Sequence, residues 1–265
     1  MERIKRIPKR ARSDVRIIRL LNNWREVLRA KLTGAPLKKV QFRNGAVVSA
    51  PETVSLAFLF DEICVRTLYN PPGYEIKAGD VVIDIGANVG VFATYAATAA
   101  PDVRVFSYEP FPGNLDWLRK NIEESKLANV KVFGEAVAGR PGTSALHVDP
   151  SGWIFHSLVR EESSEENDIL VKCVSLDQVL DDNEIEFCDL LKIDCEGSEY
   201  EILMECRPET LGRIRRIVGE YHEGANIKGT GEGLRRFLES RSFRIDYFGA
   251  LEADSGIFYA TNRAS

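Results

Sequence analysis

Short apolar runs alternate with longer amphipathic stretches from about residue 80 onward. Apolar runs of about 4–8 residues are typical of buried strands, and apolar positions three and four apart are typical of helices. The pattern predicts strands at Val81–Ile85, Val103–Tyr108, Val130–Val137, Leu190–Ile193, Ile214–Glu220 and Phe243–Phe248, with helices at Ala93–Ala100, Gly113–Lys126, Ser198–Cys206 and Glu232–Ser240. This alternation indicates an α/β fold in which helices cover both faces of a mostly parallel sheet.

The first 70 residues follow a different pattern. Helical spacing of apolar residues between arginines predicts a basic helix over 15–32, and Asn44-Gly45 favours a hairpin within Lys39–Ala50. A further helix is expected from Pro51 to Leu68. We therefore expect a basic N-terminal helical extension, residues 1–37, followed by one domain, residues 38–265.

Residues 138–180 are less regular than the rest of the chain. Two strands are expected there, at Ser144–Val148 and Ile169–Val174, on either side of a strongly acidic stretch at 161–168. We interpret the acidic stretch as a solvated loop.

Charge is distributed unevenly along the chain. The whole sequence has 35 basic and 40 acidic residues, but residues 1–39 hold 13 basic and 3 acidic ones, which is +10 and leaves −15 for the remainder. An acidic body argues against a broad nucleic-acid surface, whereas the basic arm leaves contact with RNA or a membrane surface open. No apolar run approaches the roughly 18 residues of a transmembrane helix, and no secretory signal is expected.

The cysteines indicate a reducing compartment. There are five of them, none in C-x-x-C spacing, and no histidine lies nearby at the spacing of a zinc ligand. We expect free thiols and a cytoplasmic protein rather than a disulfide framework.

The segment Asp84-Ile85-Gly86-Ala87-Asn88-Val89-Gly90 is the most informative motif. A buried strand ends at an acidic residue, and a turn containing two glycines leads into a helix. Gly86 and Gly90 are expected to let a ligand approach the backbone at the carboxyl edge of the sheet. The dinucleotide fingerprint G-x-G-x-x-G does not fit, because Asn88 and Val91 occupy its second and third glycine positions. This argues against NAD or FAD.

This motif resembles the first motif of class I AdoMet-dependent methyltransferases. Three further segments resemble the FkbM-type family of those enzymes: Val105-Phe106-Ser107-Tyr108-Glu109-Pro110 with Asn114, Leu191-Lys192-Ile193-Asp194-Cys195-Glu196-Gly197-Ser198-Glu199, and Val218-Gly219-Glu220-Tyr221-His222. The resemblance covers roughly residues 40–250. It implies a Rossmann-like class I methyltransferase fold with a sheet of the seven-stranded type, S-adenosyl-L-methionine (AdoMet) as cofactor, and O-methylation of a small molecule or glycan.

Two alternatives stay open at this point. The basic arm allows an RNA methyltransferase or RNA-binding protein, although the acidic body disfavours nucleic acid. A non-catalytic AdoMet-binding regulator is the other alternative. The sequence indicates neither the acceptor nor the oligomeric state.

Glu109 is the expected ribose-binding residue of the cofactor site. It ends the second predicted strand 19 residues after Gly90, where a carboxylate can accept hydrogen bonds from both ribose hydroxyls. Glu135 and Ala136 are expected beside the adenine ring. The predicted cofactor-binding set is Asp84, Gly86, Ala87, Asn88, Gly90, Glu109, Pro110, Asn114, Glu135, Ala136 and Asp194.

Residues at the ends of the fourth and fifth predicted strands are expected around the acceptor. Asp194, Glu196 and Glu199 are candidates to orient its hydroxyl or take its proton, although Glu199 equally suits the first turn of a helix. His222 is the expected general base, since a neutral imidazole accepts a proton near pH 7; a structural histidine is the alternative.

Two further assignments complete the expected site. His156, in the irregular segment, is a candidate for the substrate pocket. Asp194, Glu196 and Glu220 have oxygen ligands suited to a divalent cation, but the sequence contains no dedicated metal-binding loop, so we expect no metal.

Overall fold

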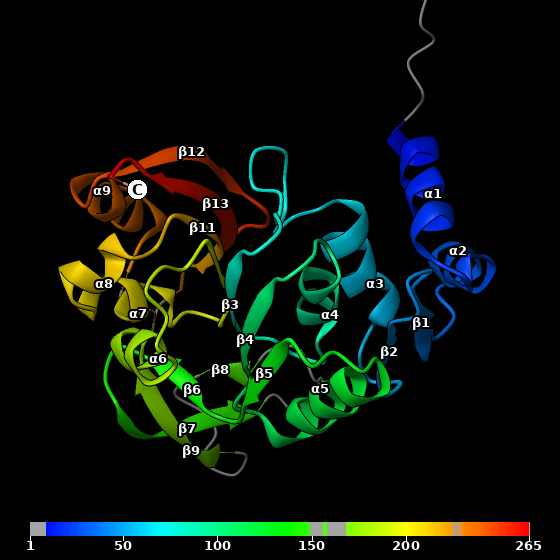
Figure 1. Cartoon of the computed structure of the whole chain (residues 1–265), viewed down its shortest axis with the longest axis horizontal. Helices are drawn as coiled ribbons and strands as arrows, with labels where there is room; N and C mark the ends of the chain where they lie inside the picture. Colours follow the sequence, from blue (N-terminus) through cyan, green and yellow to red (C-terminus); the bar gives the residue numbers. More distant parts are fainter. Residues whose placement is uncertain (1–8, 149–155, 158–167, 225–226, 228, 265) are drawn as a thin grey trace, which may run out of the picture.

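The computed structural model of the chain describes residues 9–148, 156–157, 168–224, 227 and 229–264. Its centre is a seven-stranded sheet in the order β12-β13-β11-β10-β3-β4-β5 (Figure 1). The strands are β3 (Val81–Ile85), β4 (Arg104–Tyr108), β5 (Val130–Phe133), β10 (Leu190–Ile193), β11 (Arg216–His222), β12 (Phe243–Ala250) and β13 (Ser255–Asn262). All neighbours pair in parallel except β13, which runs antiparallel to both β11 and β12. The predicted mostly parallel sheet is confirmed, while β13 was not predicted.

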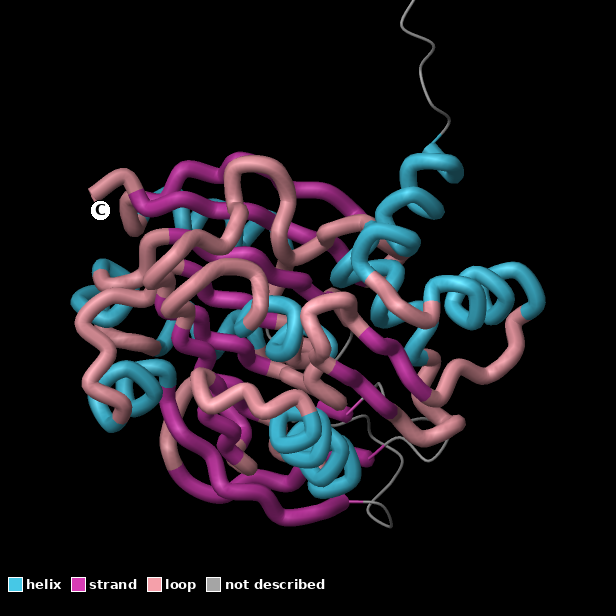
Figure 2. The backbone as a smooth tube through the Cα atoms, turned by 45° about the vertical axis from the view of Figure 1, so that its right-hand side comes forward, coloured by secondary structure: helices cyan, strands magenta, loops and turns pink. Residues whose placement is uncertain are grey.

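Helices cover both faces of this sheet (Figure 2). Side chains of β3 alternate between the faces: Val82 belongs to one core cluster and Ile83 to another. The first cluster includes residues of α4 (Val91–Ala97) and α5 (Pro112–Glu124). The second includes residues of α6 (Leu176–Asp182), α7 (Glu199–Glu205), α8 (Pro208–Gly212) and α9 (Gly231–Ser240). Burial on both faces explains why β3 is apolar almost throughout.

A second, four-stranded sheet has the order β6-β9-β7-β8. Its strands are β6 (Ala136–Ala138), β7 (Gly142–Val148), β8 (His156–Ser157) and β9 (Asp168–Ser175). The strands expected at Ser144–Val148 and Ile169–Val174 are confirmed. The single strand expected over Val130–Val137 is wrong, because the chain leaves the main sheet after Phe133 and Ala136 pairs with Cys173 instead. Residues 161–167 of the acidic stretch lie outside the described residues.

The N-terminal part begins with α1 (Lys9–Leu20) and α2 (Trp24–Thr33) instead of one helix over 15–32. The helix breaks because Leu21 forms a β-bridge with Phe42 and the Asn22 N–H donates to the Gln41 carbonyl. The predicted hairpin is confirmed as β1 (Lys39–Gln41) and β2 (Val47–Ser49). The helix expected from Pro51 is wrong: α3 (Leu56–Phe60) begins later and continues as a π-helix, η1 (Asp61–Val65).

The N-terminal helices share their core with the rest of the molecule. Ile17, Leu21 and Val27 lie in the same cluster as Val82 and Phe92. The hairpin is tied to the sheet layer by Asn121, whose amide donates to the Ser49 and Val89 carbonyls. No helix within the described residues is long and apolar enough to cross a membrane.

Candidate functional site

An open cavity lies at the carboxyl ends of β3 and β4. It measures about 550 Å³, including solvent at its mouth. Six of the expected cofactor residues line it: Gly86, Asn88, Glu109, Pro110, Asn114 and Ala136. Its remaining wall comes from Ile85, Tyr108, Val137, Leu146 and Cys195, which are not in the predicted cofactor-binding set. The cavity is therefore apolar on the side of the second sheet and polar beside the turn after β3.

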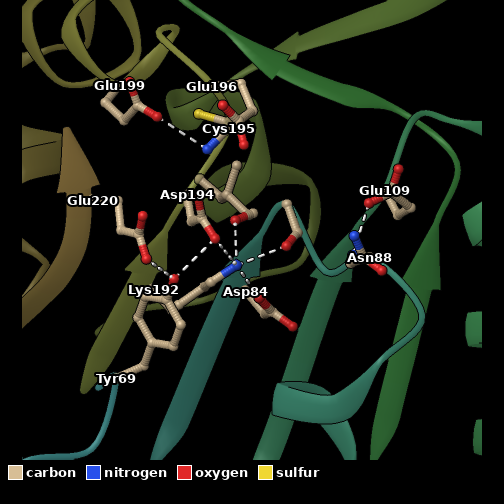
Figure 3. Close-up of polar contacts among 12 residues, drawn as sticks. Tyr69, Asp84, Asn88, Glu109, Lys192, Asp194, Cys195, Glu196, Glu199 and Glu220 are labelled. Carbon is tan, nitrogen blue, oxygen red and sulfur yellow. Dashed lines mark hydrogen bonds and ion pairs between the residues drawn. The ribbon is translucent and has the colours of Figure 1, made fainter. Parts of the chain in front are cut away.

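Glu109 is almost completely buried at the edge of this cavity, with 5% of its surface exposed. Its Oε2 accepts from the Asn88 N–H at 2.7 Å (Figure 3). Its Oε1 accepts from the Phe111 N–H at 2.9 Å. Burial raises the pKa of Glu109 to about 7, against the lowering effect of these two amides. The two fixed amides orient both oxygens of a carboxylate that titrates near neutral pH.

The glycines of the turn have a packing role that was not expected. A Cβ on Gly86, whose φ is +76°, would lie 1.8 Å from the Asp194 carbonyl oxygen. A Cβ on Gly90, whose φ is +88°, would lie 2.5 Å from Leu118 Cδ1. Both positions need glycine because other parts of the chain pack against them; Gly86 also lines the cavity, whereas Gly90 does not, and the approach of a ligand to Gly86 stays a prediction.

Five expected cofactor residues do not line the cavity. They are Asp84, Ala87, Gly90, Glu135 and Asp194. Asp84 is fully buried at the end of β3, and Glu135 forms an ion pair with Lys172. Asp84 is therefore enclosed under the turn that follows β3 and does not reach the cavity. Glu135 pairs with Lys172 instead of lining the cavity.

Lys192 of β10 was not named as a site residue, yet it lies at the centre of the polar contacts in Figure 3. Its Nζ donates to the carbonyls of Ile85 at 3.2 Å and Gly86 at 2.6 Å, and lies 3.4 Å from Asp84 Oδ1 and 3.6 Å from Asp194 Oδ2. Burial acts to lower the pKa of Lys192, but the two carboxylates outweigh it and the pKa is raised. A permanent ammonium therefore joins the ends of β3 and β10.

The Tyr69 hydroxyl lies between two acidic side chains on neighbouring strand ends. It is 2.9 Å from Asp194 Oδ2 and is also hydrogen-bonded to Glu220 Oε1. Burial and both carboxylates raise the pKa of Tyr69, so the phenol keeps its hydrogen. The phenol hydrogen of Tyr69 can be donated to only one of these two carboxyl groups at a time. Burial and Asp194 raise the pKa of Glu220, so the Glu220 carboxyl can carry the hydrogen of the other bond.

His222 ends β11 between two glutamates. Its Nδ1 lies 3.1 Å from Glu199 Oε1, and its Nε2 lies 3.4 Å from Glu196 Oε2. Burial lowers the pKa of His222, but the carboxylates outweigh it and raise the pKa to about 10. A raised pKa favours the imidazolium, which has no lone pair for an acceptor proton, and so disfavours the expected neutral imidazole; the role of His222 as general base stays a prediction.

Glu199 is held inside the protein. It is fully buried, and its carboxylate accepts from the backbone N–H groups of Cys195 and Gly197. This geometry agrees with the alternative structural reading of Glu199 and contradicts its placement as a substrate contact. His156 lies on β8, but its side chain is outside the described residues.

Two site residues, Lys192 and Tyr69, were not predicted, and only one of them could have been recognised from the sequence pattern. Lys192 stands inside a buried apolar strand, and a charge in such a run could have marked it as a paired, functional side chain. Tyr69 left no signal, since it follows a π-helix and reaches strand ends more than a hundred positions away. Only the fold brings it to Asp194.

Asp194, Glu220 and His222 each offer one ligand atom, and these atoms lie within 4.8 Å of one another. The lysine ammonium 3.6 Å from Asp194 and the charged imidazole already neutralise part of this group. The expectation that no metal is needed stays a prediction.

Comparison with known proteins shows the family. A model of the FkbM methyltransferase domain matches residues 84–245. The chain is 29% identical over 228 residues to the 31-O-demethyl-FK506 methyltransferase FkbM of Streptomyces tacrolimicus, covering 76% of this chain and 87% of that protein. It is 27% identical over 221 residues to the methyltransferase sdnD of Sordaria araneosa (72% and 83%) and 27% identical over 158 residues to the hexuronic acid methyltransferase AglP of Haloferax volcanii (58% and 61%). The chain therefore belongs to the FkbM family of AdoMet-dependent methyltransferases.

Proposed function

We propose that this methyltransferase transfers the AdoMet methyl group to a hydroxyl oxygen of a small molecule or glycan. The proposal rests above all on one contact: Gly86, in the turn that borders the cavity, packs directly against the backbone of Asp194. Asp194 lies next to Glu220 and His222, so the cavity adjoins this group of polar side chains. The names of two relatives, a 31-O-demethyl-FK506 methyltransferase and a hexuronic acid methyltransferase, support this acceptor class.

The residues of the cavity suit the cofactor. Glu109 offers two carboxylate oxygens to ribose hydroxyls, and the apolar wall of Ala136, Val137 and Leu146 suits a flat aromatic base. We assign Gly86, Asn88, Pro110 and Asn114 to the same role, since all four line the cavity. When bound, the cofactor supplies an electrophilic methyl group on a sulfonium. Asp84, Ala87 and Gly90 do not line the cavity, and we assign them to holding the shape of the turn after β3.

Asp194 is the residue that we place against the acceptor hydroxyl. Its side chain is partly exposed, and its Oδ2 is already fixed by Tyr69 and Lys192. As the new carbon–oxygen bond forms, the hydroxyl proton passes to this carboxylate. Glu196 and His222 lie beside it, with His222 Nε2 3.4 Å from Glu196 Oε2, and act as positioning residues. This assignment replaces the neutral histidine base.

Cofactor affinity is expected to depend on pH through Glu109. Below about pH 7 this carboxyl is protonated in the free protein, and only the ionised form accepts from both ribose hydroxyls. Binding of S-adenosylhomocysteine should therefore be about tenfold weaker near pH 6 than near pH 8, as measured by isothermal titration calorimetry.

Two variants separate this effect from others. Glu109→Gln should bind weakly at every pH with a flat profile, whereas Glu123→Gln, an exposed glutamate on α5, should keep the wild-type profile. A wild-type affinity that does not change between these pH values would contradict the role of Glu109.

Metal removal is expected to leave turnover unchanged. The ammonium of Lys192 and the imidazolium of His222 already supply positive charge beside Asp194. Methyl transfer should therefore continue after treatment with EDTA and desalting. Loss of turnover that Mg²⁺ or Mn²⁺ restores would overturn this prediction and implicate Asp194, Glu220 and His222 as ligands.

The function is tested by incubating the protein with methyl-labelled AdoMet and fractionated small molecules, glycans and RNA of its host. Label is expected in a methyl ether of the small-molecule or glycan fraction, and Asp194→Asn should lower turnover while leaving S-adenosylhomocysteine affinity near wild type. Label in RNA, or cofactor binding without transfer to any fraction, would contradict the proposal.

We also propose that the protein works in a reducing compartment, the cytoplasm. All five cysteines are free thiols, and four of them are buried. Burial raises the pKa of Cys64 and Cys188, so these thiols stay protonated and unreactive.

A further inference from the structure

Apolar side chains are exposed on the N-terminal helices to an unusual degree. Within the described residues, four of the eight large exposed hydrophobic side chains lie on α1, α2 and α3: Val15, Ile18, Leu32 and Phe58. Leu32 is 68% exposed and Phe58 50%. We call the exposed side of these three helices the N-terminal helical face. Contiguous exposed apolar patches on a protein surface mark interaction sites.

The same face carries unpaired positive charge. Arg19, Arg25 and Arg29 are exposed, and none forms an ion pair with a carboxylate of the described residues. Residues 1–39 have a net charge of +10, whereas the remaining sequence has −15. The face therefore combines exposed arginines with exposed apolar side chains.

The arrangement places both kinds of side chain together. Val15, Ile18 and Arg19 are three and four positions apart, so they share one side of α1. Helix α2 packs between α1 and α3, and in Figure 1 these helices lie at the end of the molecule away from β12 and α9. Nothing in the described part of the chain covers α1 and α2 on this side.

We propose that the N-terminal helical face docks onto the surface of an anionic membrane. Aliphatic side chains next to arginines fit the boundary between lipid headgroups and acyl chains, where the apolar groups enter and the guanidinium groups meet phosphates. Helices α1, α2 and α3 would thus hold the methyltransferase at the lipid surface. The proposal is independent of the acceptor that the enzyme methylates.

RNA fits this face less well than lipid does. Single-stranded RNA is bound largely by stacking of bases on aromatic rings, and of the four exposed apolar side chains of this face only Phe58 is aromatic. The indole of Trp24 is half-buried, and the Arg25 guanidinium lies 4.4 Å above it. Exposed valine, isoleucine and leucine side chains do not bind phosphate, but they can insert among the acyl chains of a lipid bilayer.

The test is co-sedimentation of the full chain with vesicles. Vesicles of phosphatidylcholine with about 30% phosphatidylglycerol should bind the protein, and binding should fall steeply with salt. Pure phosphatidylcholine vesicles should bind it weakly. The triple variant Arg19→Gln, Arg25→Gln, Arg29→Gln should lower partitioning about fivefold for each arginine, on the order of 100-fold in total.

Two further variants make the result specific. A matched triple variant, Arg104→Gln, Arg119→Gln, Arg241→Gln, removes the same charge from exposed arginines elsewhere and should bind vesicles nearly as well as wild type. The double variant Val15→Ser, Leu32→Ser keeps the charge and should still lose at least tenfold in partitioning, because the apolar contribution is lost.

The proposal is overturned by any of three outcomes: no binding to anionic vesicles, equal losses in both arginine variants, or full binding by the serine variant. Tight binding of a short single-stranded RNA that the first arginine variant abolishes, without vesicle binding, would assign the face to nucleic acid instead.

Discussion

Replacing Lys192 by methionine is expected to lower the free energy of unfolding by about 3–5 kcal/mol. Methionine keeps the length of the side chain but leaves the fully buried Asp84 without its cation, and leaves the carbonyls of Ile85 and Gly86 without their donor. Burial raises the pKa of Asp84, so protonation should reduce this loss as the pH falls. Urea unfolding of wild type and variant near pH 5 and pH 8 measures both effects.

The control for this prediction is a double-mutant cycle. Asp84→Asn combined with Lys192→Met removes both charges. The double variant should therefore lose less unfolding free energy than the two single variants lose together, by at least about 1 kcal/mol. Lys77→Met, at an exposed lysine without an ion pair in the described residues, should change stability by less than about 0.5 kcal/mol. Additive losses would show that the ammonium does not balance Asp84.

Gly86→Ala is expected to disrupt the cofactor cavity as well as the fold. The new Cβ would lie 1.8 Å from the Asp194 carbonyl oxygen, a backbone atom that cannot rotate away. Either the turn after β3 or the turn after β10 must shift, and both border the site. We expect a loss of about 3 kcal/mol or more, from overpacking added to the strained φ, and a loss of S-adenosylhomocysteine affinity of about 100-fold.

Gly73→Ala is the matched control for this variant. Gly73 also has a positive φ, +94°, but its Cβ would meet nothing within 4 Å. It should therefore cost about 1–2 kcal/mol through backbone strain alone and leave cofactor affinity unchanged. If calorimetry and urea unfolding gave the same results for both alanine variants, the close approach of Gly86 to Asp194 would not constrain the site.

Much of the main sheet was predictable, because strands buried on both faces appear as continuous apolar runs. The six predicted strands correspond to six of its seven strands, although the one over 130–137 was drawn too long. Strand β13 was missed although Ile257-Phe258-Tyr259-Ala260 form a continuous apolar run. Helix α6 did leave a signal: Ser175 and Gln178 form a capping box at its start.

The sequence by itself determined the family motifs, the α/β fold and half of the cavity, since each of these depends on residues close together in the chain. Glu109 and Asn88 lie at consecutive strand ends, and parallel strands bring such ends together. These contacts follow from local pattern and topology.

Only the tertiary structure decided the charges and the packing of the acceptor side. Lys192 is buried against Asp84, Tyr69 reaches Asp194 from outside the sheet, and His222 lies between two glutamates that fix its proton. A pKa depends on burial and on every charge within a few ångströms, and these neighbours come from segments distant in sequence. For that reason the histidine that the sequence suggested as a neutral base has its pKa raised to about 10 by the carboxylates around it.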